Sequence, residues 1–229
     1  MGHISVNELD GARVLTLNRP PANAMNIELL QELGEALRAV GADLPAALVI
    51  AGQDPFFSGG ADLKAVPHHG PEQHRQMVEG INRMVLEAYA LPCPVVGAIT
   101  GHAIAGGMVL ALCCDFRIAS RGGRYGLTEI KVGVPYPQAA IMVVRAELPP
   151  HAARRLAFGN QLTDADECVA LGAFDEALAP EEVTPRAIAL AGELGAMPSD
   201  VYARTKADLR ASTLAAMRAG AAADPLVQA

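Results

Sequence analysis

The chain has 229 residues, of which 51% are hydrophobic, so it is long enough to bury one large α/β core. Its formal net charge of −7 argues against nucleic acid or an anionic membrane as the main partner. Aromatic residues make up 4% and tryptophan is absent, so Ala, Leu, Val and Ile must fill the core.

The first third of the chain is predicted to form strands and a helix. A hairpin is expected from two strands at residues 4–8 and 13–18, and a helix at 26–41. A buried strand at 46–51 and a long glycine-rich loop at 52–60 follow. The hairpin turns at Asp10-Gly11, a pair that favours tight turns. Asn26 or Met25 caps the helix, whose apolar residues keep a period near 3.6 until Gly41.

The segment 94–120 carries the strongest pattern, and a helix predicted at 72–90 leads into it. Val95–Thr100 is apolar and β-branched, as in a strand buried on both faces. Gly106 and Gly107 open a second apolar stretch that is typical of a helix inside a core. Glycines at a helix start leave N–H groups free to hold an oxyanion, or simply allow tight packing. The uncharged run also satisfies the length rule for a membrane span, but its glycines and His102 divide it into short pieces.

The second half of the chain is predicted to be mainly helical. Residues 125–134 indicate a short strand, which an irregular segment with prolines follows. Helices are expected at 149–158, 165–171, 180–194 and 199–219, and the Ala-rich tail after Ala219 is expected to fray. Strands that alternate with helices and then give way to helices indicate an α/β core with a helical C-terminal part.

The cysteines and the N-terminal residues indicate a reducing compartment. Cys93, Cys113, Cys114 and Cys168 show no metal-ligand spacing, so buried structural thiols are expected and a metal site is not. The N-terminal stretch lacks a basic region followed by an apolar one, so no secretory signal is expected. A cytoplasmic location is the resulting prediction.

Five segments in order resemble the crotonase superfamily, the enoyl-CoA hydratases and isomerases. They are NRPPANAMN at 18–26, FFSGGADLK at 56–64, the segment 94–120 that ends in CDFRIAS, YGLTEIKVGVP at 125–135 and GAFDEA at 172–177. The resemblance implies a spiral core of ββα repeats over residues 1–176. It also implies a shortened helical C-terminal region over 177–229, with contacts in a homotrimer or a dimer of trimers. The implied substrate is an acyl-CoA thioester, and no separate cofactor is expected because coenzyme A is part of that substrate.

The same resemblance assigns the catalytic positions. The N–H groups of Ala61 and Gly106 would form an oxyanion hole, which stabilises the charge on a thioester carbonyl when a proton leaves the adjacent carbon. Glu129 takes the place of one of the two hydratase glutamates, and the other place holds Val109. The structural alternatives are an ordinary turn with Asp62 as a helix N-cap, and a solvated Glu129 at a strand end.

Valine at position 109 favours isomerisation over hydration. Adding water across a double bond needs a group that activates the water, which Val109 cannot do. Moving a double bond from C3 to C2 needs one carboxylate, and burial of Glu129 among apolar side chains would raise its pKa toward that of a general base. An enoyl-CoA isomerase is therefore expected. The alternatives are a hydratase, a hydrolase or lyase acting on a specialised acyl-CoA, and a non-catalytic acyl-CoA-binding protein.

Nine residues are expected at the substrate site: Asn23, Ala24, Gly60, Asp62, Lys64, Gly107, Met108, Val109 and Tyr136. The family places the nucleotide near the first two, and Lys64 would either approach a phosphate or stay solvated. Tyr136 stands where hydratases have a glycine-rich turn. It would narrow the acyl pocket, offer its hydroxyl as a second polar group, or simply pack in the core.

Overall fold

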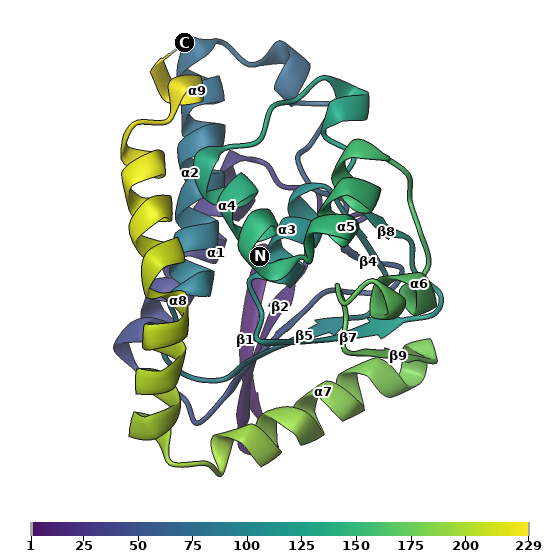
Figure 1. The fold of residues 1–229 in the computed structure, drawn as a ribbon, viewed down its shortest axis with the longest axis vertical. Helices are drawn as coiled ribbons and strands as arrows, with labels where there is room; N and C mark the ends of the chain where they lie inside the picture. Colours follow the sequence, from purple (N-terminus) through teal and green to yellow (C-terminus); the bar gives the residue numbers. More distant parts are fainter. Residues whose placement is uncertain (1, 229) are drawn as a thin grey trace.

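The computed structural model describes residues 2–228 and contains two β-sheets (Figure 1). The larger sheet lies at the centre of the fold. Its six strands lie in the order β1-β2-β3-β5-β7-β9. β1 and β2 form the hairpin predicted at Asp10-Gly11, and the later neighbours are parallel. The strands are β1 (Ile4–Leu9), β2 (Ala12–Leu17), β3 (Leu48–Ala51), β5 (Val95–Ile99), β7 (Phe116–Ser120) and β9 (Glu176–Leu178).

A smaller parallel sheet gives the fold its spiral character. It contains β4 (Phe56–Ser58), β6 (His102–Ile104) and β8 (Tyr125–Gly126), with β6 in the middle. Each of these strands follows one strand of the larger sheet and leads toward a helix, in the series β3–β4–α2, β5–β6–α3 and β7–β8–α4. The described chain therefore makes three ββα turns, which confirms the predicted fold class.

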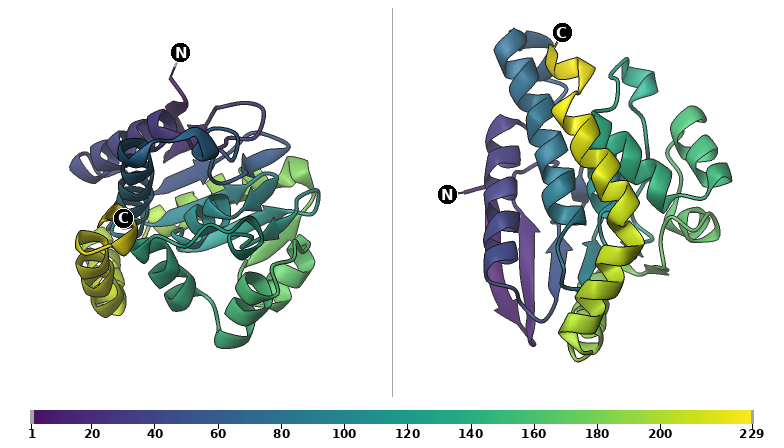
Figure 2. Two further views of the ribbon diagram at one scale, coloured as in Figure 1. Left: turned by 90° about the horizontal axis from the view of Figure 1, so that it is seen from above. Right: turned by 60° about the vertical axis from the view of Figure 1, so that its left-hand side comes forward.

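Helices cover both faces of the larger sheet (Figures 1 and 2). One face carries α1 (Ile27–Ala42), α2 (Pro71–Tyr89), α3 (Gly106–Leu112) and α4 (Gln138–Glu147), and the other carries α7 (Pro180–Gly195). Asn26 caps α1 by accepting the N–H of Leu29 at 2.9 Å. The apolar stripe of α1 is buried at Leu30, Leu33, Leu37 and Val40, as its period predicted.

The C-terminal helices are attached to the body of the molecule at several points. α8 (Ser199–Ala222) runs beside α2 and α4, and its Lys206 and Arg210 lie 2.8 and 3.0 Å from the carboxylate of Asp115 (Figure 2). The predicted boundary between residues 176 and 177 falls within β9, and α7 beyond it packs on the sheet. The shorter pieces are Val66–His68, Ile130–Val132, α5 (Pro150–Ala153), the π-helical Arg154–Phe158, α6 (Ala165–Ala170) and α9 (Pro225–Gln228).

Several elements differ from the sequence-based expectations. The strand predicted at 125–134 is wrong beyond Gly126, because β8 ends there and Ile130–Val132 forms a 3₁₀ turn. β4 lies within the predicted loop 52–60, and neither it nor β9 was predicted as a strand, because each has three residues. β6 has three residues, too few to produce an alternating pattern. α4 follows Pro135 and Pro137, which made its segment resemble a loop. The prediction that the chain frays after Ala219 is wrong, because α8 continues to Ala222 and α9 follows. None of the helices within residues 2–228 is long and apolar enough to cross a membrane.

Asp224 fastens the C-terminal tail to the body. Its Oδ2 accepts the side-chain N–H of Asn82 on α2 and the backbone N–H of Gln138 at the start of α4, both at 2.8 Å. The Oδ1 of Asn82 accepts the next N–H of α4, that of Ala139, at 2.9 Å. Side chains from α2 and the tail therefore cap α4.

Asp224→Ala is expected to lower the free energy of unfolding by about 2–3 kcal/mol, because it leaves two buried donors without their acceptor. Denaturant unfolding measures the change. Asp208→Ala is a matched control, since Asp208 makes an exposed pair with Arg204 at 3.1 Å and its loss should cost under about 0.5 kcal/mol. Equal stabilities for the two variants would contradict the capping role of Asp224.

Candidate active site

Three segments meet at one edge of the smaller sheet. β4, β6 and β8 are parallel, so their carboxyl ends share that edge. The loop after β4 carries Gly60 and Ala61, the turn after β6 leads to Gly106, and the loop after β8 carries Glu129. Successive turns of the spiral therefore bring together the three residues that were predicted to be catalytic.

These segments enclose a cavity of about 100 Å³. Its wall is mainly apolar and includes Leu63, Ile81, Ile104, Val109, Val132 and Val134. Ala61 and Gly106 also line it, and its ionisable side chains are those of Glu129 and Tyr136. The cavity thus combines backbone amides, one acid and apolar surface.

The backbone N–H groups of Ala61 and Gly106 lie close together and are free to bind a ligand. Met25 donates to the carbonyl of Gly60 at 2.7 Å and accepts from the N–H of Asp62 at 2.9 Å, so this bridge leaves the Ala61 N–H unpaired. Gly106 is the first residue of α3, where N–H groups have no partner within the helix. Within residues 2–228, no hydrogen bond engages either amide. A methyl group built on Gly106 would lie 3.9 Å from the Ala61 nitrogen.

Gly60 permits the two segments to approach so closely. Its φ is +79°, a conformation that L side chains rarely adopt. A Cβ on Gly60 would lie 2.7 Å from the carbonyl oxygen of Ile104 and 2.9 Å from the nitrogen of Gly106. Ala105 also has a positive φ, of +50°, in spite of its methyl group. Backbone strain of about 1–3 kcal/mol is therefore held beside the free amides.

Glu129 is buried in the cavity wall, with 7% of its surface exposed. Its Oε2 accepts a hydrogen bond from the Tyr136 hydroxyl at 2.7 Å. Burial raises the pKa of Glu129 above its ordinary value, and the Tyr136 hydroxyl and the backbone N–H of Glu129 offset part of this effect. A solvated carboxylate at a strand end does not fit this placement. A buried carboxyl with a raised pKa has the properties of a general base.

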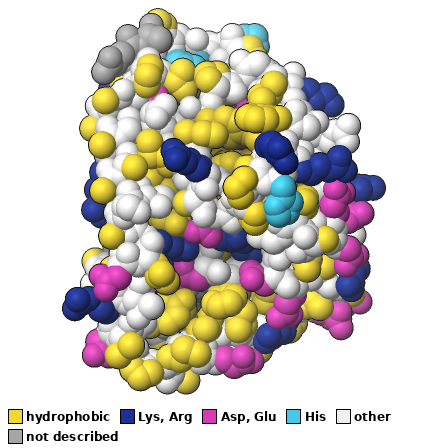
Figure 3. Space-filling view, in the orientation of Figure 1, with side chains coloured by type: hydrophobic (Ala, Val, Ile, Leu, Met, Phe, Trp, Pro, Cys, Tyr) yellow, Lys and Arg dark blue, Asp and Glu magenta, His cyan; other side chains and the backbone are white. Residues whose placement is uncertain are grey.

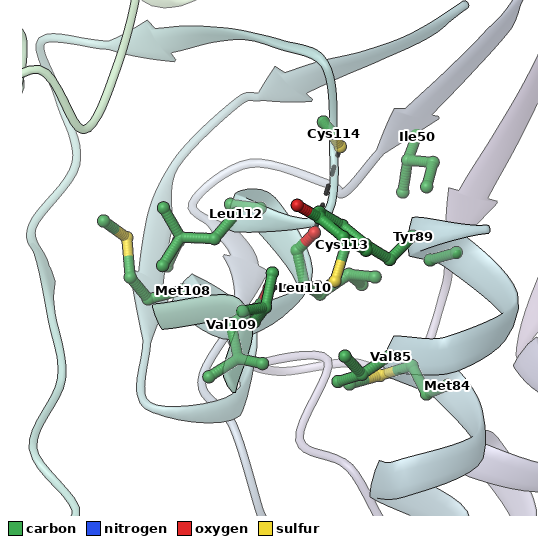
Figure 4. Packing of buried hydrophobic residues seen from close by; sticks show 14 of the residues in the cluster. Ile50, Met84, Val85, Tyr89, Met108, Val109, Leu110, Leu112, Cys113 and Cys114 are labelled. Atoms are coloured by element: carbon green, nitrogen blue, oxygen red, sulfur yellow. Dashed lines mark hydrogen bonds between the residues drawn. The ribbon is translucent and has the colours of Figure 1, made fainter. Parts of the chain in front are cut away.

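The three candidates on α3 have different surroundings. Val109 is 1% exposed and lies in the cavity wall. Met108 is fully buried in the core, where Figure 4 shows it on the side of α3 away from Tyr89. A Cβ on Gly107 would lie 2.2 Å from the carbonyl oxygen of Ser58, so this glycine lets α3 pack against β4. Val109 is the member of the three that is placed to contact a ligand.

Asn23 and Ala24, predicted near the nucleotide, hold the loops together. The Nδ2 of Asn23 donates to the carbonyls of Phe56 and Phe57 at 3.0 and 3.1 Å, and its Oδ1 accepts the N–H of Arg19 at 2.7 Å. The carbonyl of Ala24 accepts the guanidinium of Arg19 at 2.8 Å. A direct contact between the Asn23 side chain and a ligand would have to replace one of these bonds.

Arg19 is a residue that the sequence analysis missed, although it lies within the NRPP segment. Its guanidinium pairs with Asp62 at 2.9 Å, and Asp62 also accepts the N–H of Lys64 at 3.1 Å. Burial opposes ionisation, but Arg19 and the backbone donors outweigh it, so the pKa of Asp62 lies below its ordinary value. The predicted turn at Asp62 therefore exists beside the free amide of Ala61. The Lys64 side chain is exposed next to this turn.

A larger hollow, of about 760 Å³, lies between α4, α7 and α8. Figure 3 shows basic and acidic side chains at its floor and hydrophobic ones around it. At this floor, Lys206 and Arg210 are already paired with Asp115, and the hollow shares no lining residue with the cavity beside Glu129. Within residues 2–228, no three His, Cys, Asp or Glu side chains form a group that could hold a metal ion. The smaller cavity is therefore the candidate active site.

Comparison with known families agrees with the fold. The profile of the enoyl-CoA hydratase/isomerase family matches residues 8–228. The chain belongs to this family. Family members are acyl-CoA enzymes of the crotonase superfamily, and both hydratases and isomerases occur among them.

Three similar family members illustrate this range. A probable enoyl-CoA hydratase, EchA17 of Mycobacterium tuberculosis, is 32% identical over 201 residues, which is 87% of this chain and 77% of that protein. The crystal structure of the enoyl-CoA hydratase EchA3 from Mycobacterium ulcerans has a TM-score of 0.93 at 31% identity, and 100% of both chains is covered. The human mitochondrial delta3-delta2-enoyl-CoA isomerase has a TM-score of 0.90 at 26% identity, covering 99% of this chain and 89% of that one. Family membership therefore establishes an acyl-CoA enzyme fold and leaves the reaction to the residues of the site.

Proposed function

We propose that the protein is an enoyl-CoA isomerase that converts 3-enoyl-CoA into 2-enoyl-CoA. The observation that carries the proposal is the pairing of one buried carboxyl, Glu129, with the free amides of Ala61 and Gly106 around one cavity. Val109 lies in the same wall where a second carboxyl would be needed for hydration.

The reaction needs one base and one oxyanion hole. Glu129 takes a proton from C2, and the C–H electron pair forms the C1–C2 double bond of a dienolate. The charge moves to the thioester oxygen, where the amides of Ala61 and Gly106 stabilise it. Glu129 then returns the proton to C4, where the electron pair of the C3–C4 double bond forms the new C–H bond. The C1–C2 pair moves to C2–C3, and a lone pair of the thioester oxygen restores the carbonyl. Coenzyme A stays attached throughout, so the proposal involves no separate cofactor.

Hydration would demand more than this cavity offers. Water must be oriented and deprotonated while a second proton reaches the α carbon, which usually involves two acidic groups. Glu129 is the acidic side chain in the cavity wall of the described chain, and the side chain of Val109 can neither give nor accept a proton. We therefore expect hydration to be much slower than isomerisation.

Incubation with 3-enoyl-CoA, 2-enoyl-CoA and saturated acyl-CoA tests the proposal. The expected result is that 3-enoyl-CoA gains a conjugated double bond, while 2-enoyl-CoA takes up little water and saturated acyl-CoA releases no thiol. Faster hydration than isomerisation would favour a hydratase instead. Thiol release would favour a hydrolase, and tight binding without turnover a binding protein. Lyase activity, trimer formation and a cytoplasmic location stay predictions.

A further inference from the structure

Tyr136 reaches Glu129 from a segment with a restrained backbone. It stands between Pro135 and Pro137, and a proline fixes its own φ and limits the residue before it to extended conformations. α4 follows Pro137 directly, and its first N–H is held by Asp224 at 2.8 Å. The Tyr136 ring is half-buried and packs against the core. The backbone that carries the Tyr136 side chain is therefore restrained without help from a ligand.

Among the described residues, no side chain other than Tyr136 donates a hydrogen bond to the Glu129 carboxyl. The Tyr136 hydroxyl lies 2.7 Å from Oε2, and this bond lowers the pKa of Glu129 against the larger rise that burial causes. Nearby charges are directed elsewhere, because Lys131 is exposed and Asp62 is paired with Arg19. Burial keeps the Tyr136 phenol protonated by raising its pKa, so it acts as a donor.

We propose that Tyr136 is a positioning residue for Glu129. The Tyr136 hydroxyl holds Oε2 of Glu129 by its hydrogen bond, so that Oε1 alone exchanges the proton with the substrate. This inference rests on the proposed role of Glu129 as the base. With a single carboxyl, the oxygen that accepts the proton from C2 must also deliver it to C4. A carboxyl that is free to rotate would carry that proton away from C4. A carboxyl whose Oε2 is held by a hydrogen bond keeps the proton on Oε1 within reach of C4. The hydrogen bond persists in both states, since Oε2 accepts it as a carboxylate or as the carbonyl of the acid.

Tyr136→Phe tests the inference because it removes the hydroxyl and keeps the ring. The hydroxyl favours the charged form of Glu129, so its loss should raise the pKa of that carboxyl further. The acid limb of the kcat/KM profile should therefore move up by about one pH unit, and kcat at neutral pH should fall about tenfold. KM should change by less than about twofold, because the size of the cavity is unchanged. A residue that only fills space would leave the acid limb where it is.

Tyr89→Phe is the matched control. The Tyr89 hydroxyl donates to Oε1 of Glu147 at the same distance, 2.7 Å, outside the cavity that holds Glu129. This variant loses an equivalent bond, and it should keep the acid limb and kcat of the wild type.

A titration of the Glu129 carboxyl by carbon NMR gives a readout that does not depend on turnover. Its signal is the one missing from Glu129→Gln, and its midpoint should be higher in Tyr136→Phe than in the wild type. The same midpoint in both proteins would overturn the positioning role even if Glu129 is the base. Full activity of Glu129→Gln would overturn the base, and the inference with it.

Discussion

Glu129→Gln is expected to slow the isomerisation of 3-enoyl-CoA by about 10²- to 10⁴-fold, the usual contribution of a general base. Glutamine has nearly the same shape as glutamate and can still accept the hydrogen bond that Tyr136 donates at 2.7 Å. It cannot remove the proton from C2. Because the amides of Ala61 and Gly106 are untouched, the loss should appear in kcat, with little change in KM.

The same substitution should not destabilise the fold. Burial raises the pKa of Glu129 in the folded state, so ionisation of this carboxyl opposes folding. Its contribution to stability is fully present below the pKa of an unfolded glutamate and is lost as the pH rises through the higher folded value. Glu129→Gln should therefore match the wild type at acid pH and exceed its stability slightly at neutral pH.

Steady-state kinetics and denaturant unfolding at two pH values measure these effects. Glu35→Gln makes the same chemical change on the exposed face of α1 and should leave turnover unchanged. Turnover of Glu129→Gln within tenfold of the wild type would show that another group moves the proton.

Elements with their own local signals were predictable from the sequence. Asn26 caps α1, the pair Asp10-Gly11 turns the first hairpin, and the apolar residues of Val95–Ile99 form a fully buried strand. β6 and α4 have no such signals, because distant parts of the chain stabilise them. β6 pairs with β4 and β8, while Asn82 and Asp224 cap α4 from 57 and 86 residues away.

The residues of the site likewise divide into those that the sequence predicted and those that depend on contacts between distant segments. The resemblance to the crotonase superfamily predicted that Ala61, Gly106 and Glu129 belong together, and each follows a strand of the smaller sheet in the structure. Their roles stay predictions. The contact between Tyr136 and Glu129 could not be deduced, because a tyrosine between two prolines is equally compatible with packing or with hydrogen bonding. The way Asn23 binds the carbonyls of Phe56 and Phe57, across 33 and 34 residues, likewise left no pattern in the sequence.

Gly60→Ala is expected to reduce kcat by about 10²- to 10³-fold, the usual cost of losing one oxyanion-hole donor. The new Cβ would lie 2.7 Å from the carbonyl oxygen of Ile104 and 2.9 Å from the nitrogen of Gly106. Contacts this short to backbone atoms cannot be relieved by rotating a side chain. The turn that carries Gly106 must move, and its amide then shifts relative to that of Ala61. The free energy of unfolding should also fall, by about 2–4 kcal/mol.

Gly11→Ala separates displacement of the amide from backbone strain. Gly11 has nearly the same φ, +82°, but a Cβ there would meet no heavy atom of the described chain within 4 Å. Its substitution should cost about 1 kcal/mol of stability from strain alone and leave kcat unchanged. Kinetics and denaturant unfolding of the two variants give the comparison. If Gly60→Ala lost stability but kept wild-type kcat, the two amides would not stabilise the transition state, and the oxyanion hole would have to lie elsewhere in the cavity.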